Sequence, residues 1–305
     1  MFLTFDRVTK FYGPVIGVNN ISCRIGPGIT GLFGVNGAGK STLMKLASGQ
    51  LRPSLGNVRL GPCQAWSTAA KRHLGYCPDI NSFYEEMTGR EFIFAMTRLY
   101  GYTRSEARRR TEQALARVGM SDRAHRRIAG CSHGMRQRIK LAQAMVNDPE
   151  ILLLDEPLSG IDPGGRREIG ELLGHLAADG RTILVSTHVL VEVEDLADSI
   201  LVISRGRILA SGTLGEIRAL LADQPFTVEI VTADNRRAAA LLVEMHEVHS
   251  VEVHDDRLTV RTRNPTQFFS HLSDLALEHD VEILQFTTID AGADAVFSYL
   301  QPRAS

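Results

Sequence analysis

The sequence predicts an α/β protein with a mainly parallel sheet, followed by a small α+β domain. Two observations indicate the first part: short apolar runs typical of buried strands, such as residues 151–154, and stretches of helical periodicity that lie between them. The order of elements after residue 225, in which two strand–helix–strand units follow one another, predicts the second part.

Composition limits the classes of function. At 305 residues the chain accommodates one large and one small domain, and its hydrophobic content of 44% suits a packed core. A formal net charge of −1 gives no electrostatic reason to expect a nucleic acid as partner. The four cysteines form no Cys-x-x-Cys pair, which suits a reducing compartment. We find no signal-peptide pattern and no long apolar run, and we expect a cytoplasmic protein.

The elements of the first domain follow from local patterns. Residues 1–30 alternate apolar and polar side chains, which predicts antiparallel N-terminal strands. A compact strand is expected at 29–34, with a helix over 42–49 that ends at Gly49. A helical, arginine-rich subdomain is predicted at about 84–145. Further elements are listed in chain order: a strand at 151–154, a helix, a strand at 182–188, a helix over 192–198, and a hairpin at 200–209.

We place a domain boundary at 222–226, giving a first domain of residues 1–222 and a second of 226–305. The second domain has the order β-α-β-β-α-β, with helices predicted over 235–247 and 265–279. This order is typical of a ferredoxin-like fold.

A phosphate-binding loop is the strongest single signal. Residues 34–41 match the pattern GxxxxGK[ST] between a predicted strand and a predicted helix. Glycines let backbone N–H groups turn toward phosphate oxygens, Lys40 adds a positive charge, and the Ser41 hydroxyl is a ligand for Mg²⁺. The nucleotide-binding residues predicted here are Gly34, Asn36, Gly37, Ala38, Gly39, Lys40, Ser41 and Thr42.

Two acidic residues end the apolar run 151–154. Asp155 stands where α/β sheets bind ligands and is predicted to hold Mg²⁺, directly or through water. Glu156 is positioned to accept a proton from an attacking water molecule. Together with the loop, this pair predicts an ATPase.

The combination of these motifs resembles the ATP-binding subunit of ABC transporters. Residues 34–42 and 151–157 resemble its Walker A and Walker B motifs, and residues 131–137, CSHGMRQ, resemble its signature, usually LSGGQ. Residues 159–162 stand at the place of its D-loop. Details such as GMRQR and residues 186–198 resemble the ATPases paired with ABC-2-type exporters.

The resemblance implies roles for further residues. Tyr12 is expected to stack on adenine and His188 to contact the γ-phosphate. Ser132 and Gly134 are expected to close over ATP bound to a partner subunit, so that a homodimer or heterodimer forms paired sites. A separate membrane permease is the other implied partner, which would place the chain on the cytoplasmic face of the membrane.

The sequence departs from the family at several positions. Cys131, His133 and Met135 replace the usual signature residues, and Asp79 stands where a glutamine normally contacts Mg²⁺. A carboxylate still binds Mg²⁺, so Asp79 is retained as a candidate metal ligand beside Ser41 and Asp155, with a plain loop residue as the alternative.

Other readings of the sequence stay open. The ATPase of an importer is one, and a soluble ABC ATPase acting on ribosomes or DNA is another. A ribosome-acting ATPase usually has two ATP-binding cassettes in one chain, whereas this sequence has one phosphate loop and one signature. A DNA-repair ATPase would have a long heptad insertion between the Walker motifs, and residues 41–150 contain none. Arginines at 104–110 alternate with acidic residues and lack interleaved aromatics, which favours a solvated helix face over a nucleic-acid site. The histidines after residue 245 have no metal-site spacing.

Overall fold

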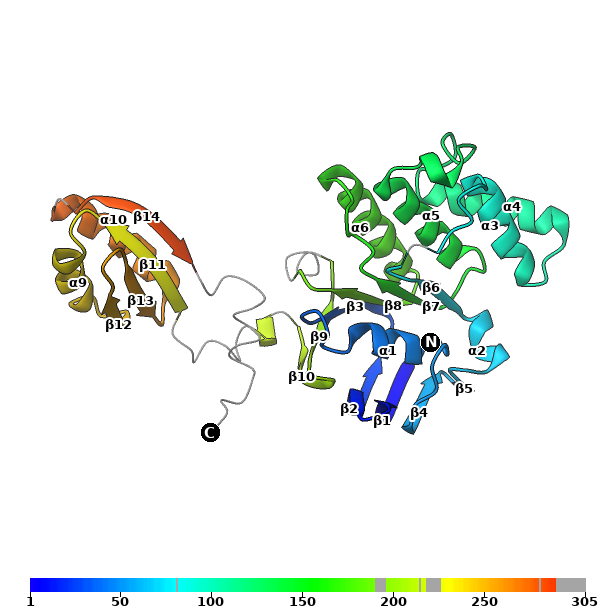
Figure 1. The fold of residues 1–305 in the computed structure, drawn as a ribbon, viewed down its shortest axis with the longest axis horizontal. Coiled ribbons are helices and arrows are strands. Elements are labelled where there is room, and N and C mark those ends of the chain that lie inside the picture. The colour runs from blue at the N-terminus through cyan, green and yellow to red at the C-terminus, as the bar shows by residue number, and fades with distance from the viewer. Residues whose placement is uncertain (81, 190–195, 214, 218–225, 280, 289–305) are drawn as a thin grey trace. The chain divides into compact units, whose positions relative to one another are not determined.

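The computed structural model describes residues 1–80, 82–189, 196–213, 215–217, 226–279 and 281–288 (Figure 1). The chain divides into two compact units, Met1–Leu214 and Gly215–Ser305. The described residues of the first unit form two hydrophobic cores, and those of the second unit form one. Most of the helix predicted over 192–198 lies outside the described residues, as does the end of the chain from 289.

A six-stranded sheet forms the centre of the first unit. Its strands, in spatial order, are β10 (Arg207–Gly212), β9 (Ser199–Ser204), β3 (Gly28–Phe33), β8 (Thr182–Thr187), β7 (Ile151–Asp155) and β6 (Leu74–Cys77). All neighbours are parallel except β9 and β10, which pair as an antiparallel hairpin. Alternate side chains of β7 enter two different cores, because Leu152 and Leu154 face one and Ile151 and Leu153 the other. The predicted parallel sheet is confirmed.

A second, antiparallel sheet packs against helix α1 (Lys40–Ala47). Its strands, in spatial order, are β2 (Val15–Ile25), β1 (Leu3–Tyr12), β4 (Leu55–Leu60) and β5 (Cys63–Gln64). Leu43 and Met44 of α1 share a core with Leu3 and Phe5 of this sheet and with Leu153 of the parallel sheet. Helix α1 is thus buried between the two sheets (Figure 1), which fixes its first residue, Lys40, at the carboxyl end of β3.

Three helices make up the helical part of this unit: α3 (Gly89–Leu99), α4 (Arg104–Arg117) and α5 (His133–Met145). They contact one another (Figure 1), and each begins at a side-chain cap, from Thr88, Thr103 and Ser132 respectively. Residues 118–132 are turns and one short 3₁₀ segment, Ile128–Gly130, so the predicted helical stretch is interrupted there. Two other helices, α2 (Thr68–Arg72) and α6 (Pro163–Ala178), flank the parallel sheet.

The second unit has the predicted ferredoxin-like fold. In chain order its elements are β11 (Phe226–Thr232), α9 (Asn235–Val243), β12 (Val248–Val253), β13 (Leu258–Thr262), α10 (Pro265–Glu278) and β14 (Ile283–Thr288). The strands pair in the order β12-β13-β11-β14, all antiparallel. Helix α9 ends at Val243, four residues before the predicted end, because residues 244–247 turn toward β12 and Val248 donates to the carbonyl of Met245. No described helix is both long and apolar enough to cross a bilayer.

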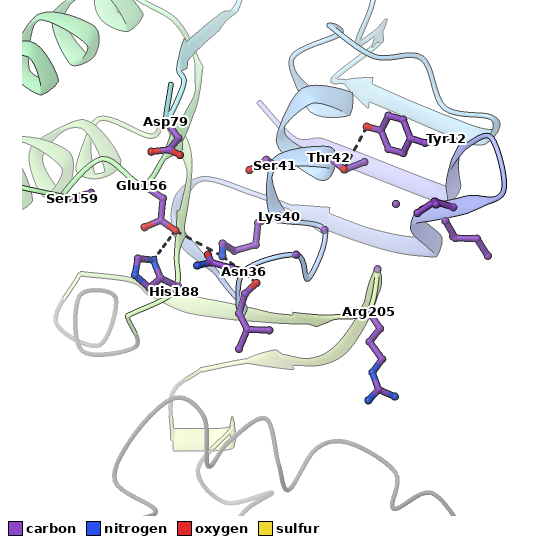
Figure 2. Close-up of a pocket in the computed structure, with 17 residues that line it drawn as sticks. Tyr12, Asn36, Lys40, Ser41, Thr42, Asp79, Glu156, Ser159, His188 and Arg205 are labelled. Carbon is purple, nitrogen blue, oxygen red and sulfur yellow. Dashed lines mark hydrogen bonds and ion pairs between the residues drawn. The ribbon is translucent and has the colours of Figure 1, made fainter. Parts of the chain in front are cut away.

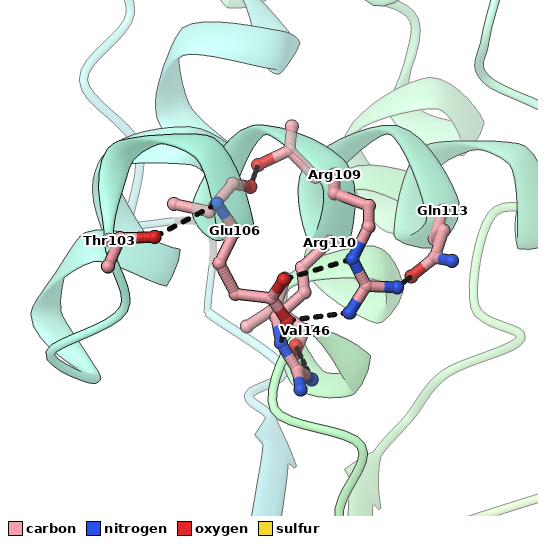
Figure 3. A network of polar contacts seen from close by, with 8 residues as sticks. Thr103, Glu106, Arg109, Arg110, Gln113 and Val146 are labelled. Carbon is pink, nitrogen blue, oxygen red and sulfur yellow. Dashed lines mark hydrogen bonds and ion pairs between the residues drawn. The ribbon is translucent and has the colours of Figure 1, made fainter.

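Two arginines of α4 are held by an acidic residue of the same helix. Glu106 accepts hydrogen bonds from Arg109 one turn later, at 2.6 and 3.0 Å, and from Arg110 at 2.7 Å (Figure 3). Arg110 also reaches the carbonyl of Val146, which follows α5. The hydrogen bond from Arg109 is the main reason that the pKa of Glu106 falls from 4.5 to about 2. One carboxylate faces two guanidinium groups, so the positive charge of these two arginines is offset in part.

We expect Glu106→Gln to lower the thermal unfolding midpoint by about 1–3 °C at pH 7, the scale of one exposed ion-pair network. Because folding lowers the pKa of Glu106, its contribution is complete above about pH 4.5 and is lost as the pH falls toward about 2. The difference between wild type and variant should therefore shrink across that window. Glu171→Gln, at an exposed position of α6, is the control. A midpoint difference that is independent of pH would contradict the assignment.

Candidate functional site

The predicted phosphate loop connects the end of β3 at Phe33 to the start of α1 at Lys40. Gly39 has φ of +112°, and a Cβ there would lie 2.8 Å from the carbonyl oxygen of Gly17, so this position requires glycine. The Lys40 ammonium donates to the Gly34 carbonyl at 2.5 Å. Burial lowers the pKa of Lys40, and the nearby carboxylates of Glu156 and Asp155 oppose that effect. The loop is therefore a tight backbone turn around a buried cation.

A cavity of about 680 Å³ opens beside this loop (Figure 2). The predicted site residues that line it are Tyr12, Asn36, Gly37, Gly39, Lys40, Ser41, Thr42, Asp79, Glu156 and His188. Tyr12 and Thr42 lie on one side of it, and Asp79, Glu156 and His188 on the other. Gly34 and Ala38 pack inward instead, since Ala38 is buried and a Cβ on Gly34 would meet Ile203. The cavity therefore has an aromatic end at Tyr12 and an acidic end at Asp79 and Glu156.

Tyr12 is supported by residues that the sequence analysis did not single out. Val15 and Ile16, in the adjoining strand β2, also line the cavity and expose their apolar side chains. The Tyr12 hydroxyl lies 3.5 Å from the Thr42 hydroxyl. The sequence signal was a tyrosine, a valine and an isoleucine within five residues, and the structure exposes all three as an apolar ligand surface.

Glu156 faces the phosphate loop from the end of β7. Its backbone has φ of +50°, which is uncommon for a residue with a side chain and is held by two strands. The Glu156 amide donates to the Ser186 carbonyl at 3.1 Å and lies 3.2 Å from the Ser186 hydroxyl. One carboxylate oxygen is 3.8 Å from the Lys40 ammonium and 3.0 Å from Nδ1 of His188 (Figure 2). The carboxylate thus points into the cavity between two nitrogen groups.

Asp155 lies just behind this wall and is 2% exposed. The Ser186 hydroxyl, from the neighbouring strand β8, donates a hydrogen bond to its carboxylate. Sequence reasoning missed Ser186, although a serine directly after the apolar residues 183–185 of β8 was a usable signal. Ser186 therefore orients both acidic residues, one through its side chain and one through its backbone.

Helix α5 supports the acidic residues from the other side. Gln137 donates to the Glu156 carbonyl at 3.1 Å, and Lys140 donates to the carbonyls of Pro78 and Asp79 at 2.9 and 2.8 Å. Sequence reasoning missed both α5 residues. A lysine between Ile139 and Leu141 was a signal of a buried charge.

The oxygen donors at the cavity fit a magnesium ion. Ser41 and Asp79 line the cavity, and the buried Asp155 carboxylate stands behind Glu156 at the end of the same strand. Hydroxyl and carboxylate oxygens are the ligand types that Mg²⁺ takes, usually with several water molecules retained. The predicted set of Ser41, Asp155 and Asp79 is therefore compatible in chemistry; Ser41 and Asp79 line the cavity, whereas Asp155 is buried behind its wall.

Ser132 and Gly134 line a second cavity of about 330 Å³, together with residues of 119–123 and 161–168. The Ser132 hydroxyl caps α5 by accepting from the Met135 amide at 3.3 Å. His133 packs against Gly160, where φ is +67° and a Cβ would lie 2.3 Å from the imidazole ring. Burial raises the pKa of the Cys131 thiol, which disfavours a reactive thiolate. Ser132 and Gly134, the two predicted signature residues, thus line a different cavity from the one beside the phosphate loop.

Comparison with known proteins gives consistent results. Residues 18–159 match the family model described as ABC transporter. The daunorubicin/doxorubicin resistance ATP-binding protein DrrA of Streptomyces peucetius is 31% identical over 297 residues, covering 95% of this chain and 89% of that protein. The linearmycin resistance ATP-binding protein LnrL of Bacillus subtilis is 30% identical over 306 residues, covering 99% and 98%.

Solved structures show the same similarity in the first unit. The ATP-binding subunit of an ABC transporter superposes with a TM-score of 0.66 at 28% identity, covering 72% of this chain and 92% of that one. The cassette MJ0796, in a dimeric structure, gives a TM-score of 0.65 at 24% identity, covering 70% and 98%.

We expect Ser186→Ala to reduce the free energy of unfolding by about 1–3 kcal/mol, because the buried Asp155 carboxylate loses a hydrogen-bond donor. Urea unfolding at neutral pH measures the change. Ser48→Ala is the matched control, since the Ser48 hydroxyl donates to the neutral carbonyl of Lys45 at the end of α1. An equal decrease in the free energy of unfolding in the two variants would show that the hydrogen bond to the Asp155 carboxylate stabilises the fold no more than one to a neutral carbonyl.

Proposed function

This chain belongs to the ATP-binding proteins of ABC transporters, and we propose that it powers export through a separate membrane permease. It is an ATPase. The observation that carries the proposed ATPase chemistry is the convergence of Glu156, Lys40 and His188 on the phosphate-loop cavity. Relatives across nearly the full chain are drug- and antibiotic-resistance proteins.

ATP binds in the cavity with its adenine on Tyr12. The exposed tyrosine ring and the apolar groups of Val15 and Ile16 suit a flat base. The phosphates lie on the loop amides of residues 34–42, at the amino end of α1, where the helix dipole favours anions. Lys40 then exchanges its bond to Gly34 for a phosphate oxygen, which offsets the cost of its burial.

Mg²⁺ bound with ATP would be held by Ser41 and Asp155, and by Asp79. Bound there, it would neutralise charge on the β- and γ-phosphates. Asp79 adds a carboxylate where the family has an amide. The metal dependence of this protein's ATPase activity should therefore differ from that of relatives with glutamine at this position.

Glu156 orients and deprotonates the attacking water. Its carboxylate lies at the phosphate end of the cavity, and its backbone is fixed by Ser186 and Gln137. His188 holds the same carboxylate at 3.0 Å and is placed to contact the γ-phosphate from the other ring nitrogen. Lys40 and the loop amides stabilise the negative charge that develops on the transferred phosphoryl group.

Two ATPase subunits act together. Ser132 and Gly134 border a different cavity from the one beside Lys40, so these signature residues serve ATP held by a second subunit. A head-to-tail pair, of identical or related chains, would complete both sites. The predicted domain of residues 226–305, which lies within the second unit, is an accessory domain for oligomerisation or regulation.

The transported compound is an amphipathic drug-like or antibiotic molecule, by analogy with relatives named for resistance to daunorubicin, doxorubicin and linearmycin. The permease supplies the pathway, and this chain works on the cytoplasmic face of the membrane, attached through the permease. The interrupted helical part from α3 to α5 is the surface we assign to that contact.

Glu156→Gln is expected to keep ATP binding, lower kcat by at least about a hundredfold, and accumulate an ATP-bound dimer, because the amide cannot accept the proton. Lys40→Ala is the paired variant and should lose binding instead, since the phosphates lose their buried cation. Fluorescent-nucleotide titration, phosphate release and size-exclusion chromatography with ATP separate the two outcomes. Turnover at the wild-type rate in Glu156→Gln would remove Glu156 from the role of base.

Affinity purification of tagged Glu156→Gln from mild-detergent membranes, with ATP present, tests the transport proposal. We expect a multi-span membrane protein at near-stoichiometric yield, identified by mass spectrometry. Lys40→Ala is the control and should recover less of it if ATP-driven closure stabilises the complex. Recovery of ribosomes or soluble proteins alone would overturn the transport role while leaving the ATPase chemistry intact.

A further inference from the structure

Lys140 is a buried cation that the proposed chemistry does not use. It lies on α5 and is 3% exposed, with the apolar residues Ile139, Leu141 and Ala142 buried beside it. Burial of an ammonium group is costly unless hydrogen bonds and opposite charges compensate it. Its place in the core therefore calls for a compensating structure.

The compensation comes from the segment that carries Asp79. The Lys140 ammonium donates to the Pro78 carbonyl at 2.9 Å and to the Asp79 carbonyl at 2.8 Å. Burial lowers the pKa of Lys140, and the negative charges of Asp79 and Asp155 are among the opposing influences. Two backbone acceptors at hydrogen-bond distance fix the position of the segment relative to α5.

The same helix reaches three parts of the proposed machinery. Its first turn carries Ser132 and Gly134 at the second cavity. One turn further, Gln137 holds the backbone of Glu156, and Lys140 follows three residues later on the same helical face. The rise from Ser132 to Lys140 is about 12 Å, so a stiff helix spans the distance between the second cavity and the Asp79 backbone.

We propose that Lys140 is a positioning residue that ties the signature helix α5 to Asp79, so that a displacement of this helix moves the Asp79 carboxylate at the nucleotide cavity. The inference rests on the proposed ATPase site and adds a mechanical link within it. Asp79 provides the charged group at the cavity, and Lys140 sets where that group stands.

The test compares Lys140→Met with Lys140→Gln. Methionine keeps an unbranched apolar stem but donates no hydrogen bond, whereas glutamine retains two N–H donors without the charge. We expect Lys140→Met to raise the Mg²⁺ concentration for half-maximal ATPase activity and to lower kcat, each by about tenfold, as for other supports of metal ligands. Lys140→Gln should recover most of both values. Lys71→Met, at an exposed position of α2, is the control and should behave as wild type.

A readout without turnover separates positioning from general damage. Binding of a fluorescent ADP without Mg²⁺ depends on the phosphate loop and should stay within about twofold in Lys140→Met, while the tightening caused by added Mg²⁺ should fall by about tenfold. A uniform loss of nucleotide affinity with and without Mg²⁺ would indicate a purely structural lysine and overturn the proposal.

The decisive comparison is made in an Asp79→Ala background. If Lys140 acts by placing the Asp79 carboxylate, Lys140→Met should change the Mg²⁺ response no further once that carboxylate is absent. Additive effects would overturn the link. If the wild-type protein hydrolyses ATP and Lys140→Met has the same Mg²⁺ responses as wild type, this inference alone is refuted. If the wild-type protein has no ATPase activity, the proposed function is refuted.

Discussion

The balance of charge at the carboxyl ends of the parallel strands is the constraint on which the rest of the site depends. Asp79, Asp155 and Glu156 follow or end the neighbouring strands β6 and β7, so three carboxylates are drawn to one edge of the sheet. Two buried lysines, Lys40 and Lys140, oppose them. Because buried charges of one sign are unstable without partners, the buried Lys40 and Lys140 and the buried Asp155 stabilise one another, while Asp79 is exposed and Glu156 is partly buried.

Backbone geometry then decides which acid meets the solvent. Asp155 remains in regular strand conformation and is buried, whereas Glu156, the next residue, adopts positive φ and turns into the cavity. Ser186 contacts both residues, so the turn is held by the neighbouring strand as well as by its own sequence. Two adjacent carboxylates thereby acquire different environments, one beside a buried hydroxyl and one open to a ligand.

How much the sequence predicts depends on whether a feature is local. The phosphate loop, the buried strand before Asp155 and the ferredoxin-like order of the second unit are local patterns, and the fold confirms them. Ser186, Gln137 and Lys140 were missed because their partners are 30, 19 and 61 residues away in sequence, and only strand pairing and helix packing bring them together. The end of α9 was also misplaced, since the turn into β12 overrides residues with adequate helix propensity.

One rigid element connects the cavity beside the phosphate loop with the cavity bordered by Ser132. Helix α5 starts at the cavity bordered by Ser132 and, within its length, holds the backbones of Glu156 and Asp79 at the other. Because Gln137 and Lys140 donate to the backbone carbonyls of Glu156 and Asp79, a shift of α5 would move these two acidic residues although neither α5 side chain lines the cavity. A ligand bound at the start of α5 would therefore affect the positions of the acidic residues at the nucleotide cavity. This role explains why the polar residues Gln137 and Lys140 occupy one face of α5 within an apolar core.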